Sequence, residues 1–411
     1  MLIKSQTHVR GGIDGTAQYI YTCHVKIVAD ENIHSVAEAF ASLGDVELIP
    51  GREMRHDVVR DADILLVRSV TRVDEGLLAG SKVGFVGSAT IGFEHVDRGY
   101  LQSRDIGFAA APGSNANSVA EYVISALMVL AGRERISLAG KTAGIIGCGN
   151  VGSKVLEKFS ALGVQCLVND PPLAALGGHE EFVSLDAILQ ADIVTVHVPL
   201  TTSGEHPTFH MLGRDFFEKL KPGSVLINTA RGAVIDNSAL DVLLDQRNDL
   251  SVVLDVWEGE PQISMSLLEK TALATPHVAG YSLEGKLRGT EMIYHAACHH
   301  LKRPVQWRAA DELPVAPPIA PVVTTTGDVN EQVRTAVLDR YDVSKDDEQL
   351  RKILSMPPHL RLAWFDRLRS HYPVRQEFWA GKTPAQALDR LSQEILVGLG
   401  FTLHQDDPSS N

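Results

Sequence analysis

The sequence of 411 residues predicts an α/β protein with two doubly wound parallel-sheet domains and a small α+β domain towards its C-terminal end. Two series of short apolar runs alternate with helical patterns, over residues 25–116 and 117–281, which is typical of parallel sheets covered by helices. The second series opens on a G-x-G-x-x-G spacing, the pattern of a Rossmann-like turn. A proline-rich stretch then precedes a final helical region, which indicates a separate C-terminal unit.

The first domain is predicted to begin at residue 25, after a polar and glycine-rich stretch over 1–24 that we interpret as a flexible extension. Val25–Asp30 is predicted as a strand, and a helical pattern from Val36 to Leu43 closes at Gly44. Strand and helix then alternate through Val46–Ile49, Ile64–Val67, Leu77–Leu78 and Val83–Val86. This alternation predicts a parallel sheet with helices on its faces.

Two loops at predicted strand ends of this domain carry side chains suited to an anion. The first holds Arg68, Ser69 and Arg72, and the second holds Thr90. Ligands of open α/β sheets bind beyond the carboxyl ends of the strands, so these residues are candidates for contacts with an anionic substrate. The alternative is that the hydroxyl groups cap helices and that Arg68 or Arg72 is a surface charge.

The second domain opens with a strand, Thr142–Ile146, and a helical pattern from Val151 to Leu162. A long apolar helix predicted from Val119 to Leu130 joins it to the first domain, so that cofactor and substrate would bind in a cleft between the two. The glycines of the turn after the strand permit a tight bend, a close approach of the backbone to a pyrophosphate, and close packing of the helix on the sheet. The predicted cofactor-binding turn consists of Gly147, Gly149, Asn150, Val151 and Gly152.

Asp170 stands at the end of the next predicted strand, Val164–Val168. A carboxylate at this place accepts hydrogen bonds from both ribose hydroxyls of NAD and repels the 2′-phosphate of NADP. The strand, the helix and the acid therefore agree in predicting NAD as the cofactor. The simpler interpretation of the glycines is a turn that packs a helix on a sheet.

Three ionisable side chains follow predicted strands of the second domain, which continue at 193–196, 225–227, 252–256 and 273–274. They are Arg231 in N-T-A-R-G, Glu260 in D-V-W-E-G-E-P and His277 in T-P-H-V-A-G. An arginine offers a fork that matches a carboxylate, a histidine can take a hydroxyl proton as hydride leaves, and a glutamate can orient that histidine. Considered singly, each has a structural alternative: Arg231 as an exposed loop charge, Glu260 as a turn residue and His277 as a loop histidine. Their order and placement together favour oxidation of a 2-hydroxy acid.

Composition narrows the possible partners and compartment. The formal net charge of −13 argues against a general nucleic-acid binder. No apolar run approaches the ~18 residues that a membrane span needs. Four cysteines without a C-x-x-C pair favour a reducing, cytoplasmic setting.

The motifs G-C-G-N-V-G, N-T-A-R-G, D-V-W-E-G-E-P and P-H-V-A-G resemble those of the D-isomer-specific 2-hydroxyacid dehydrogenases. The segments L-V-R-S-V-T-R-V, A-P-G-S-N-A and R-Y-D-V-S-K-D-D narrow the resemblance to the branch that acts on 4-phosphoerythronate in bacterial vitamin B6 (pyridoxal phosphate) synthesis. The likeness covers residues 25–405.

The resemblance implies a role for each matching residue. Arg231 would bind the substrate carboxylate, Glu260 would be the acid partner and His277 the acid–base residue. The NAD contacts would be Asp170, Ala230, Asp255 and Gly280, and the substrate contacts Ser69, Thr90 and Tyr281. The implied reaction is NAD-dependent oxidation of 4-phospho-D-erythronate to 2-oxo-3-hydroxy-4-phosphobutanoate. For its phosphate we favour Arg68 or Arg72.

The resemblance also implies the domain boundaries. Residues 282–308 would return to the substrate-binding domain of 25–116, after the NAD-binding domain of 117–281. A linker over 309–322 would lead to a dimerisation domain, 323–405, which makes the protein a homodimer; packing on its own subunit is the alternative. Within this domain the family implies a strand between Ala380 and Ser392, but A-Q-A-L-D-R-L-S, Ala385–Ser392, has a helical pattern.

Other histidines receive no chemical role. His295, Cys298, His299 and His300 lie close together on a predicted helix, and we interpret them as helix surface, so that no metal site is predicted. His206 and His210 fall in a loop to which we assign no catalytic function.

These observations predict an NAD-dependent oxidation at C2 of a phosphorylated sugar acid. Two alternatives stay open. One is another enzyme of the superfamily, of the phosphoglycerate or D-lactate type. The other is a non-catalytic NAD-sensing scaffold, which could keep Arg231, Glu260 and His277.

Overall fold

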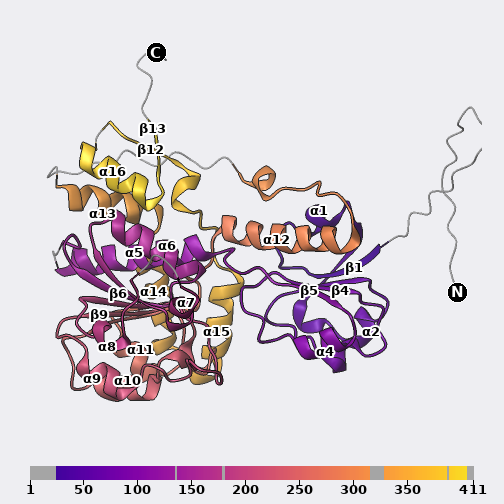
Figure 1. Cartoon of the computed structure of the whole chain (residues 1–411), viewed down its shortest axis with the longest axis horizontal. Coiled ribbons are helices and arrows are strands. Elements are labelled where there is room, and N and C mark those ends of the chain that lie inside the picture. Colours follow the sequence, from indigo (N-terminus) through magenta and orange to yellow (C-terminus); the bar gives the residue numbers. More distant parts are fainter. Residues whose placement is uncertain (1–24, 135–136, 178–180, 315–327, 387, 405–411) are drawn as a thin grey trace, which may run out of the picture.

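The computed structural model of the chain describes residues 25–134, 137–177, 181–314, 328–386 and 388–404. Two α/β bodies lie side by side, and the C-terminal helices pack on the second of them (Figure 1). The predicted extension over 1–24 and residues 315–322 of the predicted linker lie outside the described residues. The predicted fold class, with two parallel sheets and a small C-terminal sheet, is confirmed.

The first body contains a five-stranded parallel sheet with the order β2-β1-β3-β4-β5. Its elements are β1 Val25–Asp30, α1 Val36–Phe40, β2 Gly44–Ile49, η1 Gly51–Glu53, α2 His56–Val59, β3 Ile64–Val67, α3 Glu75–Leu78, β4 Phe85–Ser88, α4 Arg98–Ser103 and β5 Gly107–Ala109. Every residue of β3 and β4 is buried, because helices cover both faces of the sheet. Leu77 and Leu78 end the helix α3, whose N-cap is Asp74.

The second body contains a six-stranded parallel sheet with the order β11-β10-β9-β8-β6-β7. Its elements are β6 Thr142–Ile146, α6 Asn150–Ala161, β7 Gln165–Asn169, α7 Pro171–Leu176, α8 Leu185–Ile188, β8 Ile193–Val196, α9 Arg214–Lys219, β9 Val225–Asn228, η2 Gly232–Val234, α10 Asn237–Leu244, β10 Ser251–Leu254, α11 Met265–Lys270 and β11 Leu273–Ala274. The chain runs from β6 outward to β7 and then returns to β8 on the other side of β6. This reversal opens a crevice beyond the strand ends, where dinucleotides bind in such sheets.

Two long helices connect the bodies. The first is α5, Ala116–Glu134, and the second is α12, Leu283–Leu301, which begins at its N-cap Ser282. Ile293 and Tyr294 of α12 are fully buried in the apolar cluster of the first sheet. The chain segment after the second sheet therefore completes the core of the first body, and α12 lies along that body in Figure 1.

The C-terminal region packs on the second body of its own subunit. It contains η3 Ala309–Glu312, α13 Val329–Arg340, α14 Val343–Arg351, η4 Lys352–Ser355, α15 Pro358–Ser370, η5 Phe378–Ala380, β12 Lys382–Pro384, α16 Arg390–Leu399 and β13 Thr402–His404. Side chains of α13 and α16 share one apolar cluster with α5 and α6. The region is thus part of the core of the subunit.

The strand that the resemblance implied within residues 380–392 is present, whereas the helix predicted over Ala385–Ser392 was wrong for the described residues before Arg390. Lys382–Pro384 forms β12, which pairs in parallel with β13. The helix α16 begins only at Arg390, because the carboxylate of Asp389 accepts a hydrogen bond from the backbone N–H of Ser392 and caps the helix there.

A buried ionic network ties the C-terminal region to both connecting helices. The Arg375 guanidinium donates to the carbonyl oxygens of Ser118 on α5 (2.7 Å) and of Ala279 (3.0 Å) just before α12. The Glu377 carboxylate accepts from Ser118 and is paired with Arg288 of α12. Buried charges are stable only when they are paired in this way. The network therefore fixes the C-terminal region at the junction of the two bodies.

Candidate active site

His277 and Glu260 form the centre of the candidate site. The imidazole Nδ1 lies 2.8 Å from a carboxylate oxygen of Glu260, whose other oxygen accepts from the backbone N–H of Trp257 at 2.7 Å. The Glu260 side chain is 18% exposed and the His277 side chain 34%. Burial works to raise the pKa of Glu260, but the hydrogen bond and charge of His277 keep it below its ordinary value. The carboxylate therefore holds Nδ1 protonated and leaves Nε2 as the proton acceptor.

The loop that carries His277 is fixed by Asp255, which lies just beyond β10. One Asp255 oxygen accepts from the Thr275 hydroxyl and the Val278 N–H, both at 2.7 Å, and the other accepts from the Ala279 N–H at 3.0 Å. His277 itself has a left-handed backbone with φ of 59°, which a bulky residue adopts only where the surroundings determine it. Asp255 is 1% exposed, so its direct role here is to hold the catalytic loop.

Arg231 reaches from the second body across to the first. It follows β9, and its Nη1 donates to the carbonyl oxygen of Ala230 at 2.8 Å. Its Nε lies 3.3 Å from a carboxylate oxygen of Glu94, and a side chain at Gly92 would collide with its Nη2. The Thr90 hydroxyl donates to the Gly92 carbonyl at 2.9 Å. The structure thus brings Arg231 and Thr90, which are far apart in the sequence, to the same short loop.

The remaining substrate candidates of the first body follow β3. Arg68 is partly buried and donates through Nε to Asp30, which is fully buried, at 3.1 Å. Arg72 instead extends into solvent, with its side chain 84% exposed and paired with Asp74. Ser69 is exposed at the strand end. Arg72 therefore fits the surface-charge interpretation, whereas Arg68 is held at the strand end by its pair with Asp30.

The glycine-rich turn has the geometry that a pyrophosphate needs. Gly147 has φ of 88°, and a side chain at Gly152 would lie 2.0 Å from the carbonyl oxygen of Gly147. At Gly149 a side chain would meet nothing, so the backbone faces open space beside the first turn of α6. Gly149 is the N-cap of α6 and provides no side-chain cap. The first N–H groups of this helix are consequently available to an anion.

Asp170 ends β7 beside this turn. Its Oδ2 accepts from the Cys148 N–H at 2.8 Å and its Oδ1 accepts from the Leu173 N–H at 3.0 Å. Each carboxylate oxygen has a second acceptor position. These bonds lock the acid next to the glycine-rich turn, where the two hydroxyls of an adenosine ribose would approach. The residues present therefore fit NAD.

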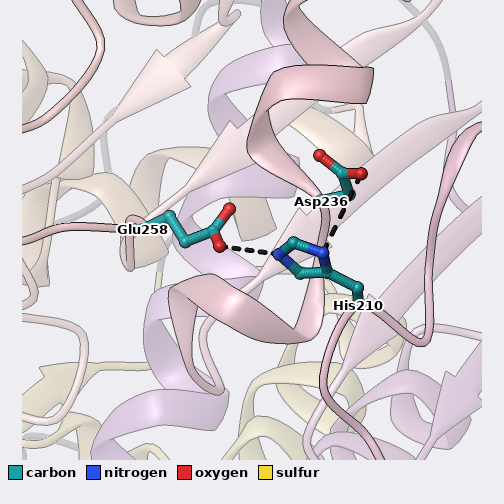
Figure 2. Close-up of side chains that lie close together, drawn as sticks. All are labelled: His210, Asp236 and Glu258. Atoms are coloured by element: carbon teal, nitrogen blue, oxygen red, sulfur yellow. Dashed lines mark hydrogen bonds and ion pairs between the residues drawn. The ribbon is translucent and has the colours of Figure 1, made fainter.

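A second histidine–carboxylate cluster lies close by, and the sequence did not reveal it. His210, which has a left-handed φ of 50°, places Nε2 2.6 Å from Glu258, and Nδ1 lies 3.9 Å from Asp236 (Figure 2). Glu258 also accepts from the Asn237 N–H, and Asp236 caps α10. This cluster joins the loop after β8 to the segments that carry Arg231 and Glu260.

The ligand atoms of His210, Asp236 and Glu258 lie within 4.8 Å of one another, a grouping that could hold a cation. However, the two carboxylates approach opposite nitrogens of the ring, as Figure 2 shows. A cation would have to break the direct bond between His210 and Glu258 in order to use both of them. The geometry is that of an imidazole bridging two acids, and the absence of a metal site stays a prediction.

No helix in the described part of the chain is long and apolar enough to cross a bilayer.

Two parts of the chain match known protein families. Residues 128–279 match the family described as D-isomer specific 2-hydroxyacid dehydrogenase, NAD binding domain. Residues 313–400 match a domain of unknown function (DUF3410). The first match contains the glycine-rich turn and all three predicted catalytic residues, and the second contains most of the C-terminal region.

Curated relatives extend over nearly the whole chain. The chain is 45% identical to the erythronate-4-phosphate dehydrogenase of Serratia proteamaculans over 379 residues, 92% of this chain and 99% of the relative. Identity is also 45% to the enzyme of that name from Yersinia pestis, over 380 residues with the same coverage.

Solved structures match the two α/β bodies. A 3-phosphoglycerate dehydrogenase from Entamoeba histolytica with bound NAD⁺ has a TM-score of 0.58 and is 25% identical in sequence. The match covers 69% of this chain and 98% of that one. A D-lactate dehydrogenase from Aquifex aeolicus, complexed with NAD and lactic acid, has a TM-score of 0.55 and 24% identity, and 67% of this chain covers 96% of it. The fold is therefore shared with these enzymes.

Proposed function

Because the chain belongs to the erythronate-4-phosphate dehydrogenases, within the D-isomer-specific 2-hydroxyacid dehydrogenases, we propose that it oxidises 4-phospho-D-erythronate at C2 with NAD. The product is 2-oxo-3-hydroxy-4-phosphobutanoate, and the reaction is a step in the synthesis of pyridoxal 5′-phosphate (vitamin B6). The observation that carries the proposal is the bond between His277 and Glu260. This pair provides a fixed proton acceptor, and the Arg231 guanidinium group, which pairs with Glu94, lies against Gly92 of the first body.

The proton of the C2 hydroxyl passes to Nε2 of His277. NAD, when bound, supplies a nicotinamide ring that accepts the hydride from C2. The Glu260 carboxylate stabilises the imidazolium that forms and prevents the ring from turning, since Nδ1 stays bonded to it. The Trp257 N–H holds Glu260 from the other side, so the pair is positioned before the substrate arrives.

Arg231 binds the C1 carboxylate in this proposal. Its guanidinium lies against Gly92, so it faces the loop that carries Thr90. A guanidinium group can form two parallel hydrogen bonds with a carboxylate, which fixes the orientation of C2 relative to His277. The charge of Arg231 also stabilises the carbonyl that develops beside the carboxylate. Thr90, Ser69 and Tyr281 complete the contacts with the substrate.

Asp170 is expected to exclude NADP. A 2′-phosphate would have to approach a carboxylate that the N–H groups of Cys148 and Leu173 hold beside the glycine-rich turn. We expect kcat/KM with NADP to be lower than with NAD by a factor on the order of 10² or more, since each 1.4 kcal/mol is worth tenfold. Equal kcat/KM values with NAD and NADP, measured as the rate of reduction of each cofactor, would show that Asp170 does not select NAD. Asp170→Ala should narrow the difference, whereas Asp57→Ala, on α2 of the first body, should leave it unchanged.

The C-terminal region is also proposed to form a homodimer. Although this region packs on its own subunit, it exposes large apolar side chains: Leu360, Val374, Trp379, Leu391 and Val397. Exposed large apolar side chains favour association with a second copy where they form a contiguous surface. Analytical ultracentrifugation that gave twice the chain mass of 44.6 kDa would support the homodimer. A mass equal to that of one chain would contradict it.

We place the enzyme in the cytoplasm. Cys166 and Cys298 form no disulfide within the described residues, which is typical of a reducing compartment. Fractionation of cells that recovered the chain outside the cytoplasm would contradict this assignment.

A panel of substrates tests the function. We expect NADH formation with 4-phospho-D-erythronate at a kcat/KM far above those with D-lactate and 3-phosphoglycerate. Preference for either of the other acids would identify a different enzyme of the superfamily. Tight NAD binding without turnover of any of them would identify a scaffold.

A further inference from the structure

The side chain of His210 is bonded to the chain segment that carries Glu260, which we call the Glu260 segment (residues 257–260). Its Nε2 lies 2.6 Å from a carboxylate oxygen of Glu258, and its Nδ1 faces Asp236 at 3.9 Å (Figure 2). The first distance is that of a direct hydrogen bond, whereas the second is too long for one. The bond that the His210 imidazole makes is therefore directed at Glu258.

Glu258 is bonded at two places to Asn237, the last residue of the turn that follows Arg231. Its second carboxylate oxygen accepts from the Asn237 backbone N–H, and its own N–H donates to the Asn237 side-chain oxygen, both at 3.2 Å. The buried Asn237 amide also donates to the carbonyl oxygens of Gly232 (3.2 Å) and Ile235 (2.8 Å). The network thus extends through the whole Arg231 turn, which we define as residues 231–237.

The Arg231 turn and the Glu260 segment are also in direct backbone contact. A side chain at Gly232 would lie 2.0 Å from the carbonyl carbon of Trp257. The Trp257 N–H donates to Glu260 at 2.7 Å, and Glu260 binds His277. The distance between Arg231 and His277 therefore depends on how firmly these two stretches of chain are held together.

His210 is joined to both stretches at once. Its backbone N–H donates to the carbonyl oxygen of Ala233 in the Arg231 turn at 2.8 Å, while its side chain binds Glu258 in the Glu260 segment. The left-handed φ of 50° at this residue persists only where the surroundings determine it. A single histidine from the loop after β8 consequently connects the two parts of the chain that carry Arg231 and Glu260.

We propose that His210 is a positioning residue, which holds the Arg231 turn and the Glu260 segment at a fixed separation through its bond to Glu258. The inference rests on the proposed function, because it assumes that Arg231 and His277 act on one substrate. Such a bond affects the rate, since a displacement of about 1 Å caused far from the chemistry can cost 10²-fold. The role uses the direct bond between His210 and Glu258, which a cation shared by both side chains would break.

The variants H210N and H210Q test whether the hydrogen bond is what matters. The amide nitrogen of glutamine is as many bonds from the backbone as Nε2 and can still donate to Glu258, whereas that of asparagine corresponds to Nδ1 and is too short. Asparagine also tolerates a left-handed backbone, so H210N should fold. With 4-phospho-D-erythronate we expect H210N to lower kcat by about 10- to 100-fold while KM for NAD stays near the wild-type value, and H210Q to recover most of kcat.

H206N is the matched control, because His206 is exposed in the same loop, and its kcat should equal that of the wild type. E258A should be about as slow as H210N, and the double variant H210N/E258A should be no slower than the slower single variant, since both remove one interaction. Losses that multiply in the double variant, or an H210Q as slow as H210N, would overturn the proposal. So would a kcat that fell on dialysis against EDTA and returned with Zn²⁺, which would identify a metal site.

Hydrogen exchange measured by mass spectrometry on the NAD-loaded protein tests the same bond without turnover. We expect H210N to exchange faster in peptides that contain residues 231–237 and 257–260, and H210Q and H206N to match the wild type. Faster exchange confined to residues 206–212, or no change at all, would overturn the proposal. If the wild-type chain does not turn over 4-phospho-D-erythronate, the proposed function fails, and hydrogen exchange still decides whether His210 holds the two stretches together.

Discussion

Replacing His277 with asparagine is expected to lower kcat by about 10²- to 10⁴-fold, the range that a positioned general base contributes. Asparagine is close to histidine in size and can bond to Glu260, but it cannot accept the hydroxyl proton. The affinity for NAD, measured by titration of protein fluorescence, should stay near the wild-type value because the glycine-rich turn is untouched. The rate is measured as NADH formation at saturating substrate.

His295→Asn is the matched control for this variant. His295 is an exposed histidine on α12, so its loss should change kcat by less than twofold on the ordinary scale of surface substitutions. Glu260→Gln should give a loss smaller than that of the His277 variant, since the imidazole remains but loses its orienting acid. A His277 variant that kept more than a tenth of the wild-type kcat would exclude this residue as the base.

Arg231→Ala is expected to lower kcat/KM by about 10³-fold or more, because a bidentate charged contact is lost and the substrate carboxylate is left unpaired. Arg231→Lys should restore little of this activity, since an ammonium group cannot reproduce the fork of a guanidinium group. NAD should still bind to both variants. Initial rates at varied substrate separate KM from kcat, and we expect both to change.

Arg390→Ala provides the control for the arginine variants. The Arg390 side chain is 92% exposed and, among the described residues, pairs with Glu394 on the same helix, so its removal should leave the kinetics unchanged. Near-normal turnover of the Arg231→Ala variant would refute carboxylate binding by Arg231. Loss of NAD binding in that variant would show a folding defect, which thermal denaturation would detect.

The sequence was sufficient for the fold because local pattern and burial agree along most of the chain. The five-residue strand β6 and the helix α6 lie where the apolar run and the glycines predicted them. A tight turn followed by a helix packed close to the sheet requires glycines at this spacing, so few other structures fit the pattern. His277 and Glu260 were also predicted, and they are 17 residues apart and bonded. The helix predicted over Ala385–Ser392 was wrong for the described residues before Arg390, because the Asp389 carboxylate caps α16 at that point.

Parts of the candidate site depend on contacts that no local pattern records. Glu94 meets Arg231 across 137 positions of sequence, and Asp366 meets Arg52 across 314. Such residues can be found only once the fold has placed the C-terminal region against the cleft.

Transfer of deuterium tests the central claim most directly. 4-Phospho-D-erythronate labelled with deuterium at C2 is incubated with the protein and NAD, and the reduced cofactor and the 2-oxo acid are analysed by mass spectrometry. We predict that the label appears in NADH, that the product has lost it, and that the His277→Asn variant performs the same transfer at a strongly reduced rate. Unlabelled NADH, or no reduced cofactor from the wild-type protein, would contradict hydride transfer from C2 in this cleft.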